Sequence, residues 1–167
     1  METKFYEISQ NNSGGSFVVD DKLCHRLIIE AYSSDEANEI AESLGCYWDG
    51  VESGDDCPCC GDRWYGSHEI NIQDQNKKWN GFEVSKWIKS EDDVDQVIKE
   101  MISLYPGATW LSELKVDGDS FSKKISGRVK LNNIEQYAQL MANQYGWTTP
   151  DYRIFYKDGT VKEIFLN

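Results

Sequence analysis

The chain has 167 residues, of which 40% are hydrophobic, so it can bury a core and is not a disordered tail. Its net charge of −12 is uneven, because residues 1–83 carry 17 acidic and 6 basic residues whereas residues 84–167 carry 12 and 11. This charge leads us to expect a protein partner with a basic surface and no direct binding to a nucleic-acid backbone. No run approaches the ~20 apolar residues of a membrane span, and the N-terminus lacks a signal peptide's apolar stretch, so we expect no membrane association and a cytoplasmic protein.

The first part of the chain predicts three strands and one helix. The strands are expected at residues 4–9, 16–19 and 24–32, and a glycine-containing turn joins the first two as a hairpin. Ser33 and Glu36 have the spacing of a capping box, which predicts that a helix begins there. Gly45 is a natural end for this helix.

The middle of the chain lacks periodicity from Cys46 to about Gly66, and a loop of this length needs something to order it. Beyond it, strands are expected at residues 68–74 and 82–88, and Ser90 is expected to cap a second helix. The apolar positions of this helix are Val94, Val97, Ile98, Met101, Ile102 and Tyr105. Strands at 109–116 and 120–131, a helix capped by Asn133, and a final hairpin over 152–156 and 161–166 complete the prediction.

Because the helices alternate with hairpins and not with single strands, the order predicts an α+β fold with a mostly antiparallel sheet, three helices and a zinc-knuckle-like loop. We expect an acidic lobe over residues 1–89, containing a Cys-rich loop at 46–68. A near-neutral lobe follows over residues 90–167 and packs with the first as one compact unit.

Three of the five cysteines lie in the segment Cys57-Pro58-Cys59-Cys60-Gly61. Within it is Cys-Pro-x-Cys-Gly, the turn that zinc knuckles use to point two thiolates into one tetrahedral site. A closed site needs four ligands, and the predicted set is Cys46, Cys57, Cys60 and His68. Cys59 competes with Cys57, and either Cys24 or His25 can reach the site from a neighbouring strand.

We expect a structural zinc, because the signatures of zinc deaminases and of HExxH hydrolases are absent. The protein is therefore expected not to be an enzyme. A zinc-dependent hydrolase remains an alternative because Asp55, Asp56, Asp62 and Glu69 are close in sequence to the cysteines.

Aromatic residues and an arginine flank the cysteines, and such side chains can anchor an interface, stack on a base, or line the loop as a small core. The predicted binding residues are Trp48, Arg63, Trp64 and Tyr65. An alternative is that the protein sequesters a small nucleotide, using stacking aromatics and cations for the phosphates. The candidate cations are Arg63, Lys123, Lys124 and Arg128.

The chain resembles a group of small uncharacterised acidic tailed-phage proteins in three motifs: NNSGGSF at residues 11–17, GCYWDG at 45–50 and CPCCGDRW at 57–64. The resemblance covers residues 4–70. It implies a phage accessory protein that acts in the cytoplasm of an infected bacterium. Such a protein is expected to bind and inhibit or redirect a host factor, in counter-defence or host takeover, or to sequester a nucleotide immune signal.

Overall fold

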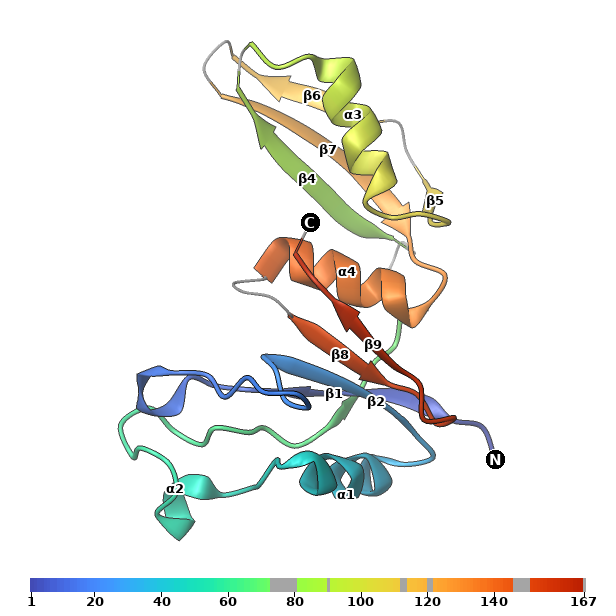
Figure 1. The fold of residues 1–167 in the computed structure, drawn as a ribbon. Coiled ribbons are helices and arrows are strands. Elements are labelled where there is room, and N and C mark those ends of the chain that lie inside the picture. Colours follow the sequence, from blue (N-terminus) through green and yellow to red (C-terminus); the bar gives the residue numbers. More distant parts are fainter. Residues whose placement is uncertain (73–80, 90, 112–113, 120–121, 146–150, 167) are drawn as a thin grey trace. The chain divides into compact units, whose positions relative to one another are not determined.

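The computed structural model describes residues 1–72, 81–89, 91–111, 114–119, 122–145 and 151–166, and it has the predicted α+β fold with mostly antiparallel strands (Figure 1). Among the helices of these ranges, none has the length and apolarity that a membrane span requires. The elements in chain order are β1 (Lys4–Ser9), η1 (Ser13–Gly15), β2 (Arg26–Ala31), α1 (Ser34–Leu44), α2 (Gly50–Ser53), β3 (His68–Glu69), β4 (Phe82–Ile88), α3 (Val94–Ser103), β5 (Thr109–Trp110), β6 (Lys115–Gly118), β7 (Lys123–Lys130), α4 (Ile134–Tyr145), β8 (Tyr152–Phe155) and β9 (Val161–Ile164).

The chain divides into two compact units, but not at the predicted boundary between residues 89 and 90. Unit 1 consists of Met1–Ile70 and Tyr145–Leu166, and unit 2 consists of Asn71–Gln144. The reason is that β8 pairs with β2 in parallel, which returns the last hairpin to the N-terminal sheet. This pairing joins residues more than 120 positions apart, and no local sequence signal specifies it.

Unit 1 contains a five-stranded sheet in the order β3-β1-β2-β8-β9. β1 and β2 are antiparallel, with Glu7 opposite Ile28. Helix α1 packs on β1 and β2, and Ala37 and Ala41 bring its backbone close to the sheet. The buried core here consists of Tyr6, Ile8, Leu23, Cys24, Leu27, Ile29, Ala31, Ala37, Ala41, Cys46 and Trp64.

The predicted hairpin between residues 4–9 and 16–19 is wrong, because residues 16–19 form no strand and β1 pairs with β2 and β3. A side chain holds this segment in place of a backbone ladder. Val18 N–H donates to Gln10 Oε1 at 2.6 Å, and Gln10 Nε2 donates to Val18 O at 3.0 Å and to Cys24 O at 2.9 Å. The Gln10 amide thus acts like a peptide group of a neighbouring strand.

Helix α1 begins as the sequence predicts. Glu36 N–H donates to Ser33 Oγ at 3.1 Å, and the Glu36 carboxylate accepts from Tyr32 N–H at 2.6 Å. Gly45 has a φ of 120° and ends the helix by donating its N–H to carbonyls of the last turn. These contacts satisfy backbone groups that a helix end leaves unpaired.

Unit 2 contains a sheet in the order β4-β7-β5, and β6 also pairs with β7. The apolar stripe predicted for α3 is confirmed, since Val97 and Met101 are buried against the sheet. The helix begins at Val94 with Asp93 as its cap, and the predicted cap, Ser90, lies outside the described residues. The buried core of this unit consists of Val84, Ile88, Val97, Met101, Tyr105, Ile125, Val129, Leu131 and Leu140.

Candidate metal site

The segment from Cys57 to Gly61 forms the tight turn that the sequence predicts. The N–H groups of Cys60 and Gly61 both donate to Cys57 O, at 3.2 Å and 3.0 Å. Gly61 has a φ of 89°, a left-handed conformation that costs glycine little and other residues more. The glycine is therefore needed where the chain leaves the turn.

The turn gathers three thiols on the surface of unit 1. Cys57 Sγ lies 2.8 Å from Cys59 Sγ, and Cys59 Sγ lies 3.7 Å from Cys60 Sγ. All three sulfurs lie within 4.8 Å of one another, and within the described ranges no other group of three His, Cys, Asp or Glu side chains is as close. Sulfurs bound to one tetrahedral zinc lie about 3.8 Å apart, given Zn–S bonds of about 2.3 Å. The three thiols can therefore hold a metal ion.

The three thiols differ in acidity. The pKa of Cys57 is lowered to about 7, chiefly because its sulfur accepts a hydrogen bond from the Cys59 thiol and further ones from the N–H groups of Cys59 and Cys60. The pKa of Cys59 is raised to about 11, mainly because its proton is shared with the Cys57 sulfur. Since the thiolate is the form that binds metal, Cys57 is the first ligand available at neutral pH.

We expect Cys57 to be the most reactive cysteine in metal-free protein. Its alkylation rate should rise with pH through about 7 and level off above it, because the thiolate is the nucleophile and a lowered pKa makes it available at lower pH. Mass spectrometry of iodoacetamide-treated protein across this pH range measures the rate at each site. Urea-unfolded protein is the control, in which all five cysteines should react alike. Faster labelling of Cys59 or of the buried Cys46 would contradict the assignment.

Two of the predicted zinc ligands lie elsewhere. Cys46 is 4% exposed in the core of unit 1, where burial raises its pKa to about 12. His68 is in β3, and its Nε2 lies 3.2 Å from Glu7 Oε2. Neither belongs to the cysteine group, whereas Cys59, the predicted competitor of Cys57, does. Distance along the chain is a poor guide to these ligands, because the chain turns at the end of α1, where Cys46 N–H donates to Ala41 O at 3.0 Å, and Cys46 enters the core.

Cys24 and His25, the two residues that the sequence offers as alternative ligands from a neighbouring strand, also make other contacts. Cys24 is fully buried, its Sγ donates to Arg26 O at 3.1 Å, and burial raises its pKa to about 11. The His25 ring lies 4.3 Å from the Phe17 ring, measured between centroids. Neither residue is part of the cysteine group.

A buried carboxylate fixes the base of the cysteine turn. Asp56 is 7% exposed; its Oδ1 accepts from Tyr47 Oη at 2.6 Å and its Oδ2 accepts from Arg63 N–H at 2.8 Å. Its own N–H donates to Gly50 O at 2.9 Å. These bonds join α2, the turn and the segment after the turn, so polar contacts order the long loop that had no periodicity.

Arg63 and the segment before β2 complete this arrangement. The Arg63 guanidinium donates to Ser13 O at 2.6 Å and to Ser16 O at 2.7 Å. Ser13 Oγ accepts from Cys57 N–H at 3.0 Å, and Asn11 Nδ2 donates to Cys60 O at 2.7 Å. The three sequence motifs therefore meet at one place. We call the contacts of Asp56 and Arg63 with these segments the Asp56 network.

Gly50 is the position in the Asp56 network where no side chain fits. A Cβ at Gly50 would lie 1.8 Å from Asp56 Oδ2 and 2.8 Å from Tyr47 Cε2. We expect Gly50→Ala to destabilise unit 1 by about 1–3 kcal/mol, because the carboxylate must move out of its hydrogen bonds. Urea denaturation measures this change. Gly66→Ala is the control, since a Cβ there meets nothing within 4 Å; an equal loss in both variants would contradict the steric explanation.

The predicted binding residues have different environments. Trp64 is 3% exposed in the core of unit 1, so its predicted role as a binding residue is wrong and the alternative that it lines a small core is correct. Arg63 is engaged in the Asp56 network. Trp48 is half-buried, packs against the core and donates from Nε1 to Glu42 Oε1. Tyr65 is 52% exposed and is the most exposed of the four.

The carboxylates named for the alternative hydrolase make contacts within the loop beside the turn. Asp56 belongs to the Asp56 network, Asp62 Oδ1 accepts from Val51 N–H at 2.9 Å, and Asp55 accepts from Ser53 Oγ at 2.7 Å. A general base for a metal-bound water must face that water. Asp56 and Asp62 hold the loop by these bonds, and Glu69, the fourth acid named, pairs with Lys4 at 3.2 Å.

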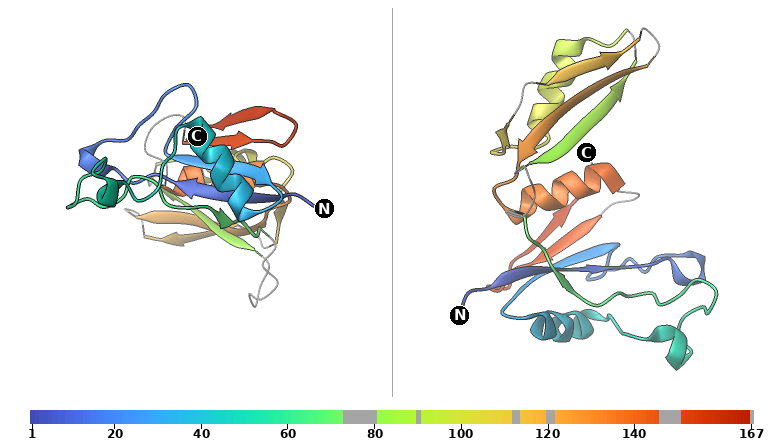
Figure 2. Two further views of the ribbon diagram at one scale, coloured as in Figure 1. Left: turned by 90° about the horizontal axis from the view of Figure 1, so that it is seen from below. Right: turned by 180° about the vertical axis from the view of Figure 1, so that it is seen from behind.

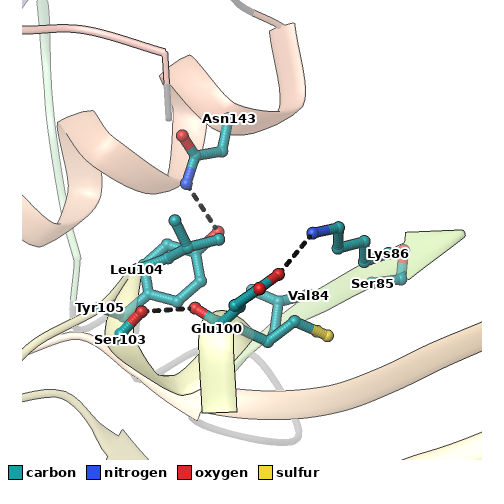
Figure 3. A pocket seen from close by; sticks show the side chains of 9 residues that line it. Val84, Ser85, Lys86, Glu100, Ser103, Leu104, Tyr105 and Asn143 are labelled. Carbon is teal, nitrogen blue, oxygen red and sulfur yellow. Dashed lines mark hydrogen bonds and ion pairs between the residues drawn. The ribbon is translucent and has the colours of Figure 1, made fainter. Parts of the chain in front are cut away.

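Unit 2 has a cavity of about 430 Å³ beside the end of α3 (Figure 3). Lys86 and Glu100 form an ion pair at its wall, with Nζ 3.4 Å from Oε2. Asn143 Nδ2 donates to Tyr105 Oη at 3.4 Å. The charges of Lys86 and Glu100 neutralise each other, and none of the predicted binding residues lines the cavity. It therefore adds no support to the predicted functions.

Comparison with known proteins gives a family but no activity. No curated protein and no solved structure matches the chain. A family model described as Domain of unknown function (DUF7296) matches residues 3–103, which is more than half of the 167 residues. The match includes all three motifs of the Asp56 network and the cysteine turn. The chain therefore belongs to the DUF7296 family.

Proposed function

We propose that the protein is a non-enzymatic binding protein whose cysteine turn holds a zinc ion and contacts a protein partner. The observation that carries this proposal is the group of three surface sulfurs, Cys57, Cys59 and Cys60, within 4.8 Å of one another. Zinc fits a site made of thiolates, because it binds Cys strongly and has no geometric preference of its own. The Asp56 network supports the proposal because it fixes the backbone of the turn.

Three thiolates leave one position of a tetrahedral zinc for another ligand. A structural zinc has four protein ligands, so the fourth is expected to come from the partner or to be water in the free protein. Zinc at this position would contribute to recognition more than to folding, because the loop already has the hydrogen bonds of the Asp56 network. This differs from the closed site that the sequence predicts.

The charge of unit 1 indicates the kind of partner. Unit 1 has 18 acidic and 7 basic residues. A surface of one charge steers an oppositely charged partner and weakens as salt screens it. We therefore propose a partner with a basic surface. The resemblance to tailed-phage proteins supports a bacterial host factor, which the protein would inhibit or redirect in the cytoplasm.

Zinc titration of cysteine variants tests the site. Cys59→Ser and Cys60→Ser are each expected to lower zinc affinity by at least about 100-fold, since each removes one of three ligands and the loss of a residue that only orients a ligand already costs up to about 100-fold. Cys46→Ala is the matched control because Cys46 was the predicted ligand but lies in the core. Competition with a chromophoric chelator measures the affinities. An equal loss in Cys46→Ala, or no loss in Cys59→Ser, would overturn the assignment.

Capture of a partner tests the binding function. The zinc-loaded wild type should retain a bacterial protein that the triple variant Cys57→Ser, Cys59→Ser, Cys60→Ser does not retain. At about 0.5 M salt the wild type should also release this protein, because salt screens the attraction between the charged surfaces. Tyr65→Ala should weaken retention, since Tyr65 is the exposed aromatic residue beside the turn. If the cysteine variant retains the bacterial protein as well as the wild type does, and high salt does not release it, the proposal is contradicted.

A further inference from the structure

Helix α3 packs against one face of the sheet of unit 2, and no helix of this unit's described residues packs against the other face, which we call the open face. Buried and less buried residues alternate along β7, and the buried ones, Ile125, Gly127 and Val129, face the core. In β4, Val84 and Ile88 face the same core. Because side chains alternate across a strand, the intervening residues lie on the opposite face. Figure 2 (right) shows the sheet from this opposite side.

The strand register orders the side chains of this open face into rows. Trp87 of β4 lies opposite Lys124 of β7, which lies opposite Asp117 of β6. The next row contains Ser85, Ser126 and Lys115. Further along are Glu83 opposite Arg128, and Lys130 opposite Thr109. The open face thus has four cationic and two acidic side chains, and one large aromatic ring.

Charge in unit 2 is separated between the two sides of the sheet. This unit has 11 acidic and 10 basic residues, so the acidity of the chain belongs to unit 1. Five of the 11 acids are in residues 91–100, on α3 and just before it. Four of the 10 bases lie on the open face beside two acids, whereas Lys123 lies on the α3 side by the alternation of β7. The open face is therefore basic although the whole chain is acidic.

Trp87 is the unusual residue on this face, because 65% of its surface is exposed. The Nζ of Lys124 lies 5.7 Å from the centre of its ring, so a cation is held beside an exposed aromatic surface. A tryptophan in a core would bury most of its area. Here the ring lies on an otherwise polar face, where it is available to stack on a flat ligand.

We propose that the open face of unit 2 binds single-stranded nucleic acid. Proteins that bind single strands combine aromatic rings, on which bases stack, with cations that follow the phosphates. Trp87 would stack an unpaired base, and Lys124, Lys115 and Lys130 would lie beside the phosphates of the neighbouring nucleotides. A duplex does not expose its base faces, so it lacks the stacking contribution. This site is separate from the cysteine turn and does not depend on the function proposed for it.

Fluorescence anisotropy with a labelled oligothymidylate of about twelve nucleotides tests the proposal. The full-length protein should bind this strand more tightly than a duplex of the same length. Trp87→Ala should weaken binding by about 5- to 150-fold, which is the loss of affinity usually measured when an aromatic ring that stacks on one base is replaced by alanine. Trp87→Phe should keep most of the affinity, because phenylalanine retains an aromatic ring. With three phosphate contacts, the logarithm of the affinity should fall with the logarithm of salt concentration with a slope of about −2.

Two controls distinguish binding at this open face from binding at another part of the chain. Lys124→Ala should weaken binding and flatten the salt slope by about 0.7, whereas Lys99→Ala, an exposed residue of α3, should do neither. The triple variant Cys57→Ser, Cys59→Ser, Cys60→Ser should bind the single strand with the affinity of the wild type. No binding at about 50 mM salt, equal binding of duplex, or full binding by Trp87→Ala would each overturn the proposal.

Discussion

Replacing Trp64 with alanine is expected to destabilise unit 1 by about 3–5 kcal/mol, the usual cost of removing a buried tryptophan side chain. Trp64 is 3% exposed and belongs to the core that includes Ile8, Leu27 and Cys46. The loss combines the apolar area returned to water with the cavity that remains. Urea denaturation followed by circular dichroism gives the magnitude, and hydrogen exchange locates it in β1 and β2.

Tyr65→Ala is the matched control for this variant. The neighbouring aromatic residue is 52% exposed, so its removal should change stability by less than about 0.5 kcal/mol. The pair of variants separates a core residue from a surface one at adjacent positions. A Trp64→Ala protein of normal stability that has lost its partner would contradict the structure and restore the predicted role of Trp64 as an interface residue.

Replacing Asp56 with alanine is expected to cost about 3–5 kcal/mol, because it breaks a buried charge cluster and leaves other polar groups unpaired. Tyr47 Oη and Arg63 N–H would lose their acceptor, and the Arg63 guanidinium would lose the carboxylate 4.0 Å from its Nε. The variant should also bind zinc more weakly, since the Asp56 network fixes the turn. Denaturation and zinc titration measure the two effects.

Asp55→Ala controls for the loss of one negative charge beside the cysteines. Asp55 is exposed and accepts a hydrogen bond from Ser53 Oγ, so this variant should lose less than about 1 kcal/mol. Similar losses in both variants would mean that charge, and not the buried hydrogen bonds of Asp56, stabilises the loop.

The local elements could be predicted because their signals are local. The Ser33 cap, the apolar stripe from Val94 and the Asp-Gly turn before β9 each depend on a few neighbouring residues, and the structure has all three. The pairing of β1 could not be predicted. The sequence suggested a return strand at 16–19, but the Gln10 amide takes the hydrogen bonds that a strand would have made. Strand partners depend on the whole chain and not on the turn alone.

Part of the cysteine site could be predicted because its signal is also local. The turn and two of its thiols, Cys57 and Cys60, follow from a five-residue motif. The further ligands could not be inferred from spacing, because α1 places Cys46 in the core and β3 places His68 beside Glu7. The sequence drew attention to Asp56 only as a carboxylate of the alternative hydrolase site, and its role in fixing the loop was not predicted. A carboxylate that is buried in the fold has no sequence signature distinct from an exposed one.

X-ray absorption at the zinc edge, on zinc-loaded protein purified without a metal-affinity tag, tests the central claim most directly. It counts the sulfur atoms bound to the metal. We predict one zinc per chain with three sulfurs at about 2.3 Å and one nitrogen or oxygen, which corresponds to Cys57, Cys59 and Cys60 with one position left for a partner or water. Two sulfurs with histidine nitrogen, four sulfurs from one chain, or no bound zinc would contradict it.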